Sequence, residues 1–267
     1  MASGIVGLIC GVRDLFCPPK CSSCKKLLDW YVPRYGNVRR IALCRECYAL
    51  WREETVQACG VCGERVRACL CMPMLLKEAK CQGLFKLAYY LPSKGDSVQN
   101  RLIYHIKRSN DSKTFSFLAS QLSSGIGQLL SDEEIDRADC LITYVPRSRR
   151  TLLKEGVDQS RELAIQLGRQ LGIEFSTLIE RNARSNTPQK ELTPEAREKN
   201  AQDAFFPTTR ERVCRQKTVL LVDDVITTGA TMARCVQILR KMGASRVYCV
   251  AAASDGINRY RGVRAGE

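Results

Sequence analysis

The 267-residue sequence predicts an α/β protein with a mainly parallel sheet, preceded by a small cysteine-rich module that binds metal. Three observations predict this fold class. Eleven of the 15 cysteines lie before residue 82, helical and extended apolar segments alternate from about residue 84, and one apolar strand leads directly into two carboxylates and a glycine-rich turn. We therefore expect an N-terminal helix and a double zinc-binding module over residues 1–82, and an α/β domain over residues 83–267.

Composition excludes several classes of protein. Hydrophobic residues make up 45% of the chain, which is too many for a disordered protein. No apolar stretch approaches the roughly 20 residues that span a bilayer. The segment 5–16 carries Arg13 and Asp14 in its middle, unlike a secretory signal. We expect a cytoplasmic protein without a membrane span.

The chain is strongly basic, with a formal net charge of +14. Two zinc ions bound by eight thiolates would lower that charge to about +10. Such an excess of cations suits a polyanionic ligand, either nucleic acid or a polyphosphate. The plainer alternative is that the excess of basic residues serves solubility alone.

Four cysteine pairs at short spacing define the first module, namely Cys21 with Cys24, Cys44 with Cys47, Cys59 with Cys62, and Cys69 with Cys71. A C-x2-C pair forms a turn whose backbone N–H groups point at the sulfurs, and two pairs complete a tetrahedron around Zn²⁺. The simplest pairing is sequential and gives about two structural zinc sites, while a cross-braced pairing is the alternative. Because its last pair is C-x-C, the second site has the weaker signal.

The remaining cysteines lack ligand spacing. We expect Cys10, Cys17 and Cys81 not to bind metal, and Cys140, Cys214, Cys235 and Cys249 to be buried core residues. Before the first pair, Ile5, Leu8, Ile9 and Val12 recur at helical spacing, which predicts a short helix packed on the zinc module.

The second part of the chain alternates between the two kinds of element. The apolar patterns predict helices over residues 115–130, 159–171 and 231–242, and strands over 140–145, 175–179, 218–222 and 247–253. Gly243 is placed to cap the last helix. His105 lies in an amphipathic segment, where a surface or core role is expected rather than a catalytic one.

The most informative stretch is residues 219–231, VLLVDDVITTGAT. A buried strand delivers Asp223 and Asp224, and a turn rich in hydroxyls then opens a helix. The start of that helix offers unpaired backbone N–H groups to an anion, and Gly229 lets the backbone approach it closely. Carboxylates accept hydrogen bonds from vicinal hydroxyls. The pattern therefore predicts a site for a ribose 5-phosphate.

This stretch resembles the phosphoribosyl pyrophosphate (PRPP) signature of type I phosphoribosyltransferases, whose fold is Rossmann-like with a mainly parallel sheet. The resemblance implies that Asp223 and Asp224 hold the ribose hydroxyls. It also implies a pyrophosphate loop after Pro146, a mobile flap over residues 185–200, and Mg²⁺ bound together with PRPP. The implied PRPP-binding residues are Thr227, Thr228, Gly229, Ala230, Thr231, Arg147, Ser148, Arg149, Arg150 and Lys107.

The order of motifs along almost the whole chain is similar to that of the ComF-like proteins, the ComFC and GntX relatives linked to bacterial DNA uptake. The matching segments are the cysteine pairs and residues 106–108, 144–150, 158–160, 181–200 and 204–205. One segment departs from the family. Where the family usually carries Arg-Gly-Phe-Asn-Gln, this chain has Glu155-Gly156-Val157-Asp158-Gln159, so we expect weaker polyphosphate binding there, and catalytic competence is an open question.

The resemblance implies a PRPP-binding protein that acts in DNA uptake and natural transformation. One alternative is an active phosphoribosyltransferase that transfers ribose phosphate from PRPP to an unknown nitrogen acceptor. Another is a non-catalytic module that binds single-stranded DNA or senses PRPP, with a DNA-uptake helicase as its partner. The Arg39–Arg40 and Arg147–Arg150 clusters and the aromatic residues Trp30, Tyr31 and Tyr35 favour DNA, although a solvated turn and packing within the zinc module explain them too.

Overall fold

The computed structural model describes residues 18–28, 42–90, 97–182, 204–209 and 211–255. The helices are α2 (Arg45–Glu54), α3 (Met74–Glu78), α4 (Val98–Arg108), α5 (Ser112–Asp132), α6 (Arg149–Glu155), α7 (Gln159–Leu171), α9 (Glu211–Cys214) and α10 (Ala230–Lys241), with a 3-10 turn at Arg137–Asp139. The strands are β1 (Gly83–Tyr90), β2 (Cys140–Tyr144), β3 (Glu174–Phe175), β4 (Ile179–Arg181), β5 (Phe205–Pro207), β6 (Thr218–Ile226) and β7 (Arg246–Asp255).

The central sheet has five strands in the order β1-β7-β6-β2-β3, and every neighbouring pair is parallel. Strands β4 and β5 form a separate antiparallel pair. Parallel strands need crossover connections, and the helices between them supply these. The α/β fold class with a mainly parallel sheet is therefore confirmed.

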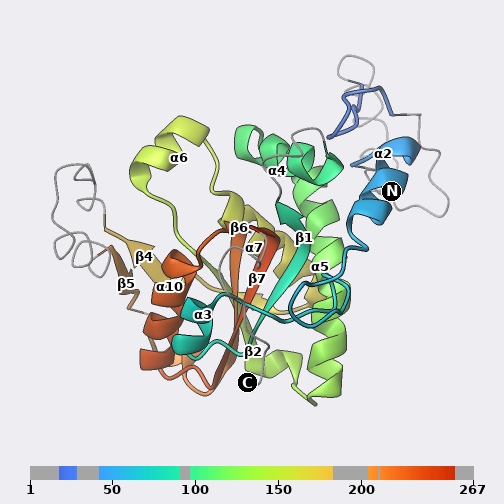
Figure 1. Ribbon diagram of the computed structural model, residues 1–267. Coiled ribbons are helices and arrows are strands. Elements are labelled where there is room, and N and C mark those ends of the chain that lie inside the picture. Colours follow the sequence, from blue (N-terminus) through green and yellow to red (C-terminus); the bar gives the residue numbers. More distant parts are fainter. Residues whose placement is uncertain (1–17, 29–41, 91–96, 183–203, 210, 256–267) are drawn as a thin grey trace, which may run out of the picture.

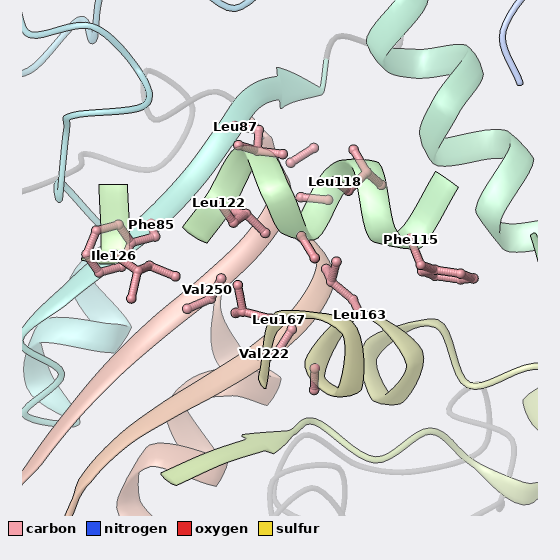
Figure 2. Packing of buried hydrophobic residues seen from close by; sticks show 14 of the residues in the cluster. Phe85, Leu87, Phe115, Leu118, Leu122, Ile126, Leu163, Leu167, Val222 and Val250 are labelled. Carbon is pink, nitrogen blue, oxygen red and sulfur yellow. The ribbon is translucent and has the colours of Figure 1, made fainter. Parts of the chain in front are cut away.

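Both faces of the sheet are buried, which explains why its strands are nearly continuous apolar runs. In β6, Leu220 and Val222 face one core cluster, and Val219 and Leu221 face the other. Helices α5 and α7 cover the first face, and α3 and α10 cover the second (Figure 1). Figure 2 shows the first face from close by, with leucines of α5 and α7 packed over Val222 and Val250.

The predicted helices are found within a few residues of their expected bounds. Helix α7 begins after Asp158, whose carboxylate accepts a hydrogen bond from the backbone N–H of Arg161 at 3.1 Å. It ends at Gly172, whose φ of +67° is the left-handed conformation that glycine adopts at little cost. Gly243, with a φ of +93°, follows the end of α10 as expected.

The prediction of a single strand over residues 175–179 is wrong. The chain leaves the edge of the sheet after β3, where the backbone N–H of Ser176 still donates to Ile142 at 2.9 Å. It turns away and re-enters an extended conformation in β4, which pairs with β5 instead. An apolar pattern at a sheet edge does not specify which partner strand a residue joins.

The cysteine-rich segment packs directly on the α/β domain. Trp51 of α2 is buried, and its ring meets Phe117 of α5 edge to face with 5.6 Å between centroids.

The described residues include no helix that is long and apolar enough to cross a membrane. The helix expected over residues 5–16 lies outside the described residues. The four cysteines expected in the core, Cys140, Cys214, Cys235 and Cys249, are all buried.

Candidate ribose-phosphate site and cysteine clusters

Strand β6 carries the two adjacent carboxylates. Strand β6 extends to Ile226, so Asp223 and Asp224 are its sixth and seventh residues out of nine and do not belong to the turn that follows. Asp223 pairs with Ala251 of β7. The two side chains meet different neighbours, Ser160 and Arg147, but their carboxyl groups lie close enough for Asp224 to influence the pKa of Asp223.

Asp223 is held by two hydrogen bonds to the same oxygen. The hydroxyl of Ser160, at the start of α7, donates to its Oδ1 at 2.7 Å, and the backbone N–H of Asp224 donates at 2.9 Å. Burial raises the pKa of Asp223 well above its ordinary value, and the nearby charge of Asp224 adds to this effect. The carboxyl group is thus oriented but costly to ionise.

Asp224 is paired with a cation from the expected pyrophosphate loop. The Nη2 of Arg147 lies 2.6 Å from Asp224 Oδ2, and its Nη1 lies 2.6 Å from Glu155 Oε2. Burial alone would lower the pKa of Arg147, but the two carboxylates outweigh it and raise this pKa. The amide of Gln159 donates to Glu155 at 3.1 Å and to the backbone oxygen of Lys107 at 3.3 Å.

The turn after β6 has the shape that the sequence predicts. Thr227, Thr228 and Thr231 are exposed, whereas Gly229 is buried with a φ of +80° and precedes the first residue of α10. A Cβ atom at this glycine would lie 3.4 Å from Pro73 and Leu76 of the α3 region. The backbone conformation therefore requires glycine here, and α3 packs against the turn from behind.

The other expected anion-binding residues are more scattered. Arg149 and Arg150 are exposed on α6, which lies at the end of the molecule toward which the strands run (Figure 1). The Ser148 hydroxyl caps α6 by accepting from the backbone N–H of Thr151 at 3.1 Å. Ala230 is exposed at the start of α10, and Lys107 is half-buried on α4. The expected flap over residues 185–200 lies outside the described residues.

The eight cysteines form two clusters, grouped sequentially as Cys21, Cys24, Cys44 and Cys47, and Cys59, Cys62, Cys69 and Cys71. Within each cluster the sulfur atoms lie within 4.8 Å of one another. Those of Cys24 and Cys44 are 3.7 Å apart, close to the separation of about 3.8 Å that Zn–S bonds of about 2.3 Å give in a tetrahedron. Burial opposes ionisation of Cys21, but backbone N–H groups, with Cys44 foremost, lower its pKa to about 7. Both clusters can hold a zinc ion.

The second cluster has an additional feature that suits a metal. The Lys86 side chain of β1 is only 2% exposed. Its ammonium donates to the sulfur of Cys69 at 3.3 Å and to the backbone oxygens of Cys69 and Cys71 at 3.2 and 2.9 Å. Because a buried ammonium needs a negative partner, this contact favours thiolates at the cluster, and four thiolates in turn need a cation such as Zn²⁺.

The sequence predicted no role for Lys86 or Ser160, and it predicted only that Glu155 would weaken polyphosphate binding. Lys86 is the only charged residue in the apolar run GLFKLAYY. Because both faces of a parallel strand are buried, this position indicates that the Lys86 side chain is buried in the fold. The contacts of Ser160 with Asp223 and of Glu155 with Arg147 were not predicted, because they depend on how α6 and α7 approach β6 in space.

Comparisons with known proteins agree with this geometry. Residues 151–263 match the family described as "Phosphoribosyl transferase domain". The sheet order and this match define a protein with a type I phosphoribosyltransferase domain. More particularly, the chain is a relative of competence protein F of Haemophilus influenzae, with 24% identity over 213 residues that cover 79% of this chain and 90% of that protein. The resemblance to the ComF-like proteins is thereby confirmed.

Two further proteins illustrate the range of similarity. DNA utilization protein YhgH of Escherichia coli strain K12 is 28% identical over 182 residues, covering 67% of this chain and 76% of that protein. Among solved structures, a hypoxanthine phosphoribosyltransferase of Staphylococcus aureus is 12% identical and covers 61% of this chain and 77% of that one, with a TM-score of 0.36.

Proposed function

We propose that the chain binds PRPP with Mg²⁺ at the carboxyl end of β6 and acts in the cytoplasm in the uptake or handling of DNA. Asp223 and Asp224 would hold the ribose hydroxyls, residues 227–231 the 5-phosphate, and Arg147 the pyrophosphate. One observation carries this proposal. One strand carries two carboxylates near its carboxyl end, the turn that follows has a buried glycine and opens a helix, and Arg147 contacts one of these carboxylates.

The distribution of charge supports this orientation of the ligand. Two carboxylates would repel a phosphate but accept hydrogen bonds from a diol, so the ribose belongs beside Asp223 and Asp224. The turn at Gly229 offers N–H groups to an anion, and exposed hydroxyls of Thr227 and Thr228 adjoin it. Magnesium would be bound together with PRPP and would supply positive charge to its pyrophosphate.

The role in DNA handling comes from the relatives, whose names are competence protein F and DNA utilization protein. The net charge of +14 suits such a role, because phosphate backbones bind basic surfaces. We expect each cysteine cluster to hold one zinc ion with a structural role, since four thiolates leave no open coordination position. A helicase of the uptake machinery is the proposed protein partner.

A second candidate function is transfer of ribose phosphate from PRPP to a nitrogen acceptor. Such a transfer needs no protein nucleophile, because the protein positions PRPP and stabilises the charge of the leaving pyrophosphate. Arg147 is placed for that task, although Glu155 neutralises part of its charge. Release of pyrophosphate from PRPP across a set of nucleobases and small amines would reveal this activity.

Thermal unfolding tests PRPP binding directly. Saturating PRPP with Mg²⁺ should raise the melting temperature of the wild type by about 5–10 °C, as expected for a ligand at roughly 100 times its Kd. The double variant Asp223→Ala with Asp224→Ala should lose this shift. The matched control, Asp132→Ala with Asp139→Ala, removes two exposed carboxylates elsewhere and should keep it. An equal shift in the first double variant would reject the assigned ribose site.

A further inference from the structure

A pocket of about 490 Å³ lies between the first cysteine cluster and α4. The residues of its lining that matter here are Lys25, Tyr90, Arg101, Tyr104, His105 and Arg108. None of them belongs to the ribose-phosphate site on β6. Its volume is within the range of small-ligand pockets.

The lining is cationic. Lys25, Arg101 and Arg108 carry positive charges, and the described lining contains no carboxylate. The carboxylate of Asp111 contacts one lining residue, because it accepts hydrogen bonds from His105 at 3.0 Å and from Thr114 at 2.8 Å. Burial would raise the pKa of Asp111, but these hydrogen bonds lower it to about 2, so its charge is already engaged. The pocket therefore suits an anion.

One wall of the pocket offers a flat surface. The guanidinium of Arg108 lies over the ring of Tyr104, 4.0 Å from its centroid, and Tyr104 is 54% exposed. These residues stand one helical turn apart on α4, so the pair is fixed by the helix. An exposed arginine–tyrosine stack is a platform on which a nucleobase can stack irrespective of its identity.

The pocket is held in shape by contacts between the first cysteine loop and the α4 region. The ammonium of Lys25 donates to His105 Nδ1 at 2.8 Å and to the backbone oxygen of Ser22 at 2.9 Å. Since an ammonium only donates, His105 accepts at Nδ1 and donates from Nε2 to Asp111. Arg101 Nε donates to the Ser23 hydroxyl at 2.8 Å. Contacts between the cysteine loop and α4 thus hold Lys25 and Arg101 in a fixed arrangement at the pocket.

We propose that this pocket binds one nucleotide unit of a single-stranded nucleic acid, with the base on the Tyr104–Arg108 platform and a phosphate beside Lys25 and Arg101. The proposal rests on the role in DNA handling given above and names the site where the strand is held. Stacking combined with cationic contacts to the backbone gives binding that tolerates any sequence and weakens as salt rises.

Fluorescence anisotropy with a labelled oligothymidylate of about 12 nucleotides tests the proposal on the zinc-loaded full chain. Tyr104→Ala should weaken binding about 5- to 150-fold, the equivalent of one lost base stack, whereas Tyr104→Phe should bind like the wild type. Arg108→Ala, which removes the other half of the platform, should also weaken binding. Arg101→Ala, which removes a phosphate contact, should reduce the slope against the logarithm of salt concentration by about 0.7. Arg169→Ala, which removes an equal charge from an exposed position on α7, should change neither quantity.

Three results would overturn the proposal. These are wild-type affinity in both Tyr104→Ala and Arg108→Ala, an equal loss in Arg169→Ala, or equal affinities for thymidine monophosphate and for the oligonucleotide. The last result would assign the pocket to a free nucleotide. The melting shift with PRPP separates this proposal from the one for β6, because Tyr104→Ala should keep that shift whether or not the strand binds.

Discussion

Arg147 bridges two carboxylates, with Asp224 and Glu155 each 2.6 Å from its guanidinium. Asp224 is an expected ribose ligand, and Arg147 is an expected pyrophosphate ligand. In this structure they satisfy each other, so PRPP has to replace the contact between them with its own hydroxyls and phosphates. Glu155, which stands where ComF-like proteins usually carry arginine, adds a competitor for the same guanidinium.

The first prediction concerns this competitor. Glu155→Gln keeps the shape of the side chain and removes its charge, which leaves Arg147 freer to bind pyrophosphate. We expect PRPP to bind about fivefold more tightly, corresponding to a Coulomb energy of about 1 kcal/mol between partly exposed charges. Isothermal titration calorimetry measures the change. Glu162→Gln on α7 is the matched control and should leave the affinity unaltered; weaker binding in Glu155→Gln would show that this carboxylate orients Arg147 instead.

The second prediction concerns the cost of ionising Asp223. Because its folded-state pKa is raised, its contribution to stability is complete below the ordinary carboxyl pKa and is lost as the pH rises through the raised value. Asp223→Asn removes the charge and keeps an oxygen for the hydrogen bonds from Ser160 and the Asp224 backbone. Without ligand, the variant should therefore melt at a higher temperature than the wild type near neutral pH, by about 2–4 °C for each kcal/mol gained.

The pH dependence of that gain is the critical measurement. Across a series of buffers from alkaline to acidic, it should be largest at the alkaline end and shrink as the pH falls toward the raised pKa, where the wild-type carboxyl takes up a proton. Asp139→Asn, which changes an exposed carboxylate, should show no such trend. A variant less stable than the wild type across this range would mean that the ionised Asp223 stabilises the fold.

The fold was largely predictable because local patterns determine most of it. Helix α7 was expected at its observed bounds, since its leucine spacing and its flanking Asp158 and Gly172 are all local signals. Strand β6 was expected to end at Val222 but extends to Ile226. Two adjacent carboxylates are typical of the start of a loop, but here both residues remain in strand β6, which pairs with β7.

The candidate site was predictable in its residue types but not in its contacts. Asp223, Asp224 and Gly229 form a contiguous motif, so one segment of sequence contains them. The contacts of Arg147 with Asp224 and of Ser160 with Asp223 join residues 77 and 63 positions apart. No periodicity connects such residues, because the sheet order brings them together only after folding.

The third prediction concerns the buried Lys86. Lys86→Met retains the volume of the side chain and removes the charge beside Cys69, so the second cluster loses its compensating cation. We expect zinc to leave this cluster about 10- to 100-fold more readily, as is typical when a residue that contacts a metal ligand is changed. Transfer of zinc to a colorimetric chelator measures the rates, with Cys59→Ser identifying the phase that belongs to this cluster. The control Lys241→Met, at an exposed position on α10, should release zinc at the wild-type rate. A wild-type rate in Lys86→Met would show that the charge of Lys86 does not help to hold zinc.

The last prediction is that each cysteine cluster supports the binding of a different ligand. The second cluster supports PRPP binding, and the first supports oligonucleotide binding. Helix α3 begins three residues after Cys71, and its Leu76 packs with Pro73 against Gly229 of the expected phosphate turn. Loss of metal from the second cluster should loosen this support, so Cys59→Ser should reduce the melting shift caused by PRPP.

The first cluster instead supports the α4 pocket through Lys25 and Ser23. Cys24→Ser should therefore weaken oligonucleotide binding and leave the PRPP shift intact. Elemental analysis should give about two zinc ions for the wild type and about one for each variant. Equal effects of both variants on both ligands would show that the clusters act only on overall stability, because a specific mechanical link requires each change to act on the element it contacts.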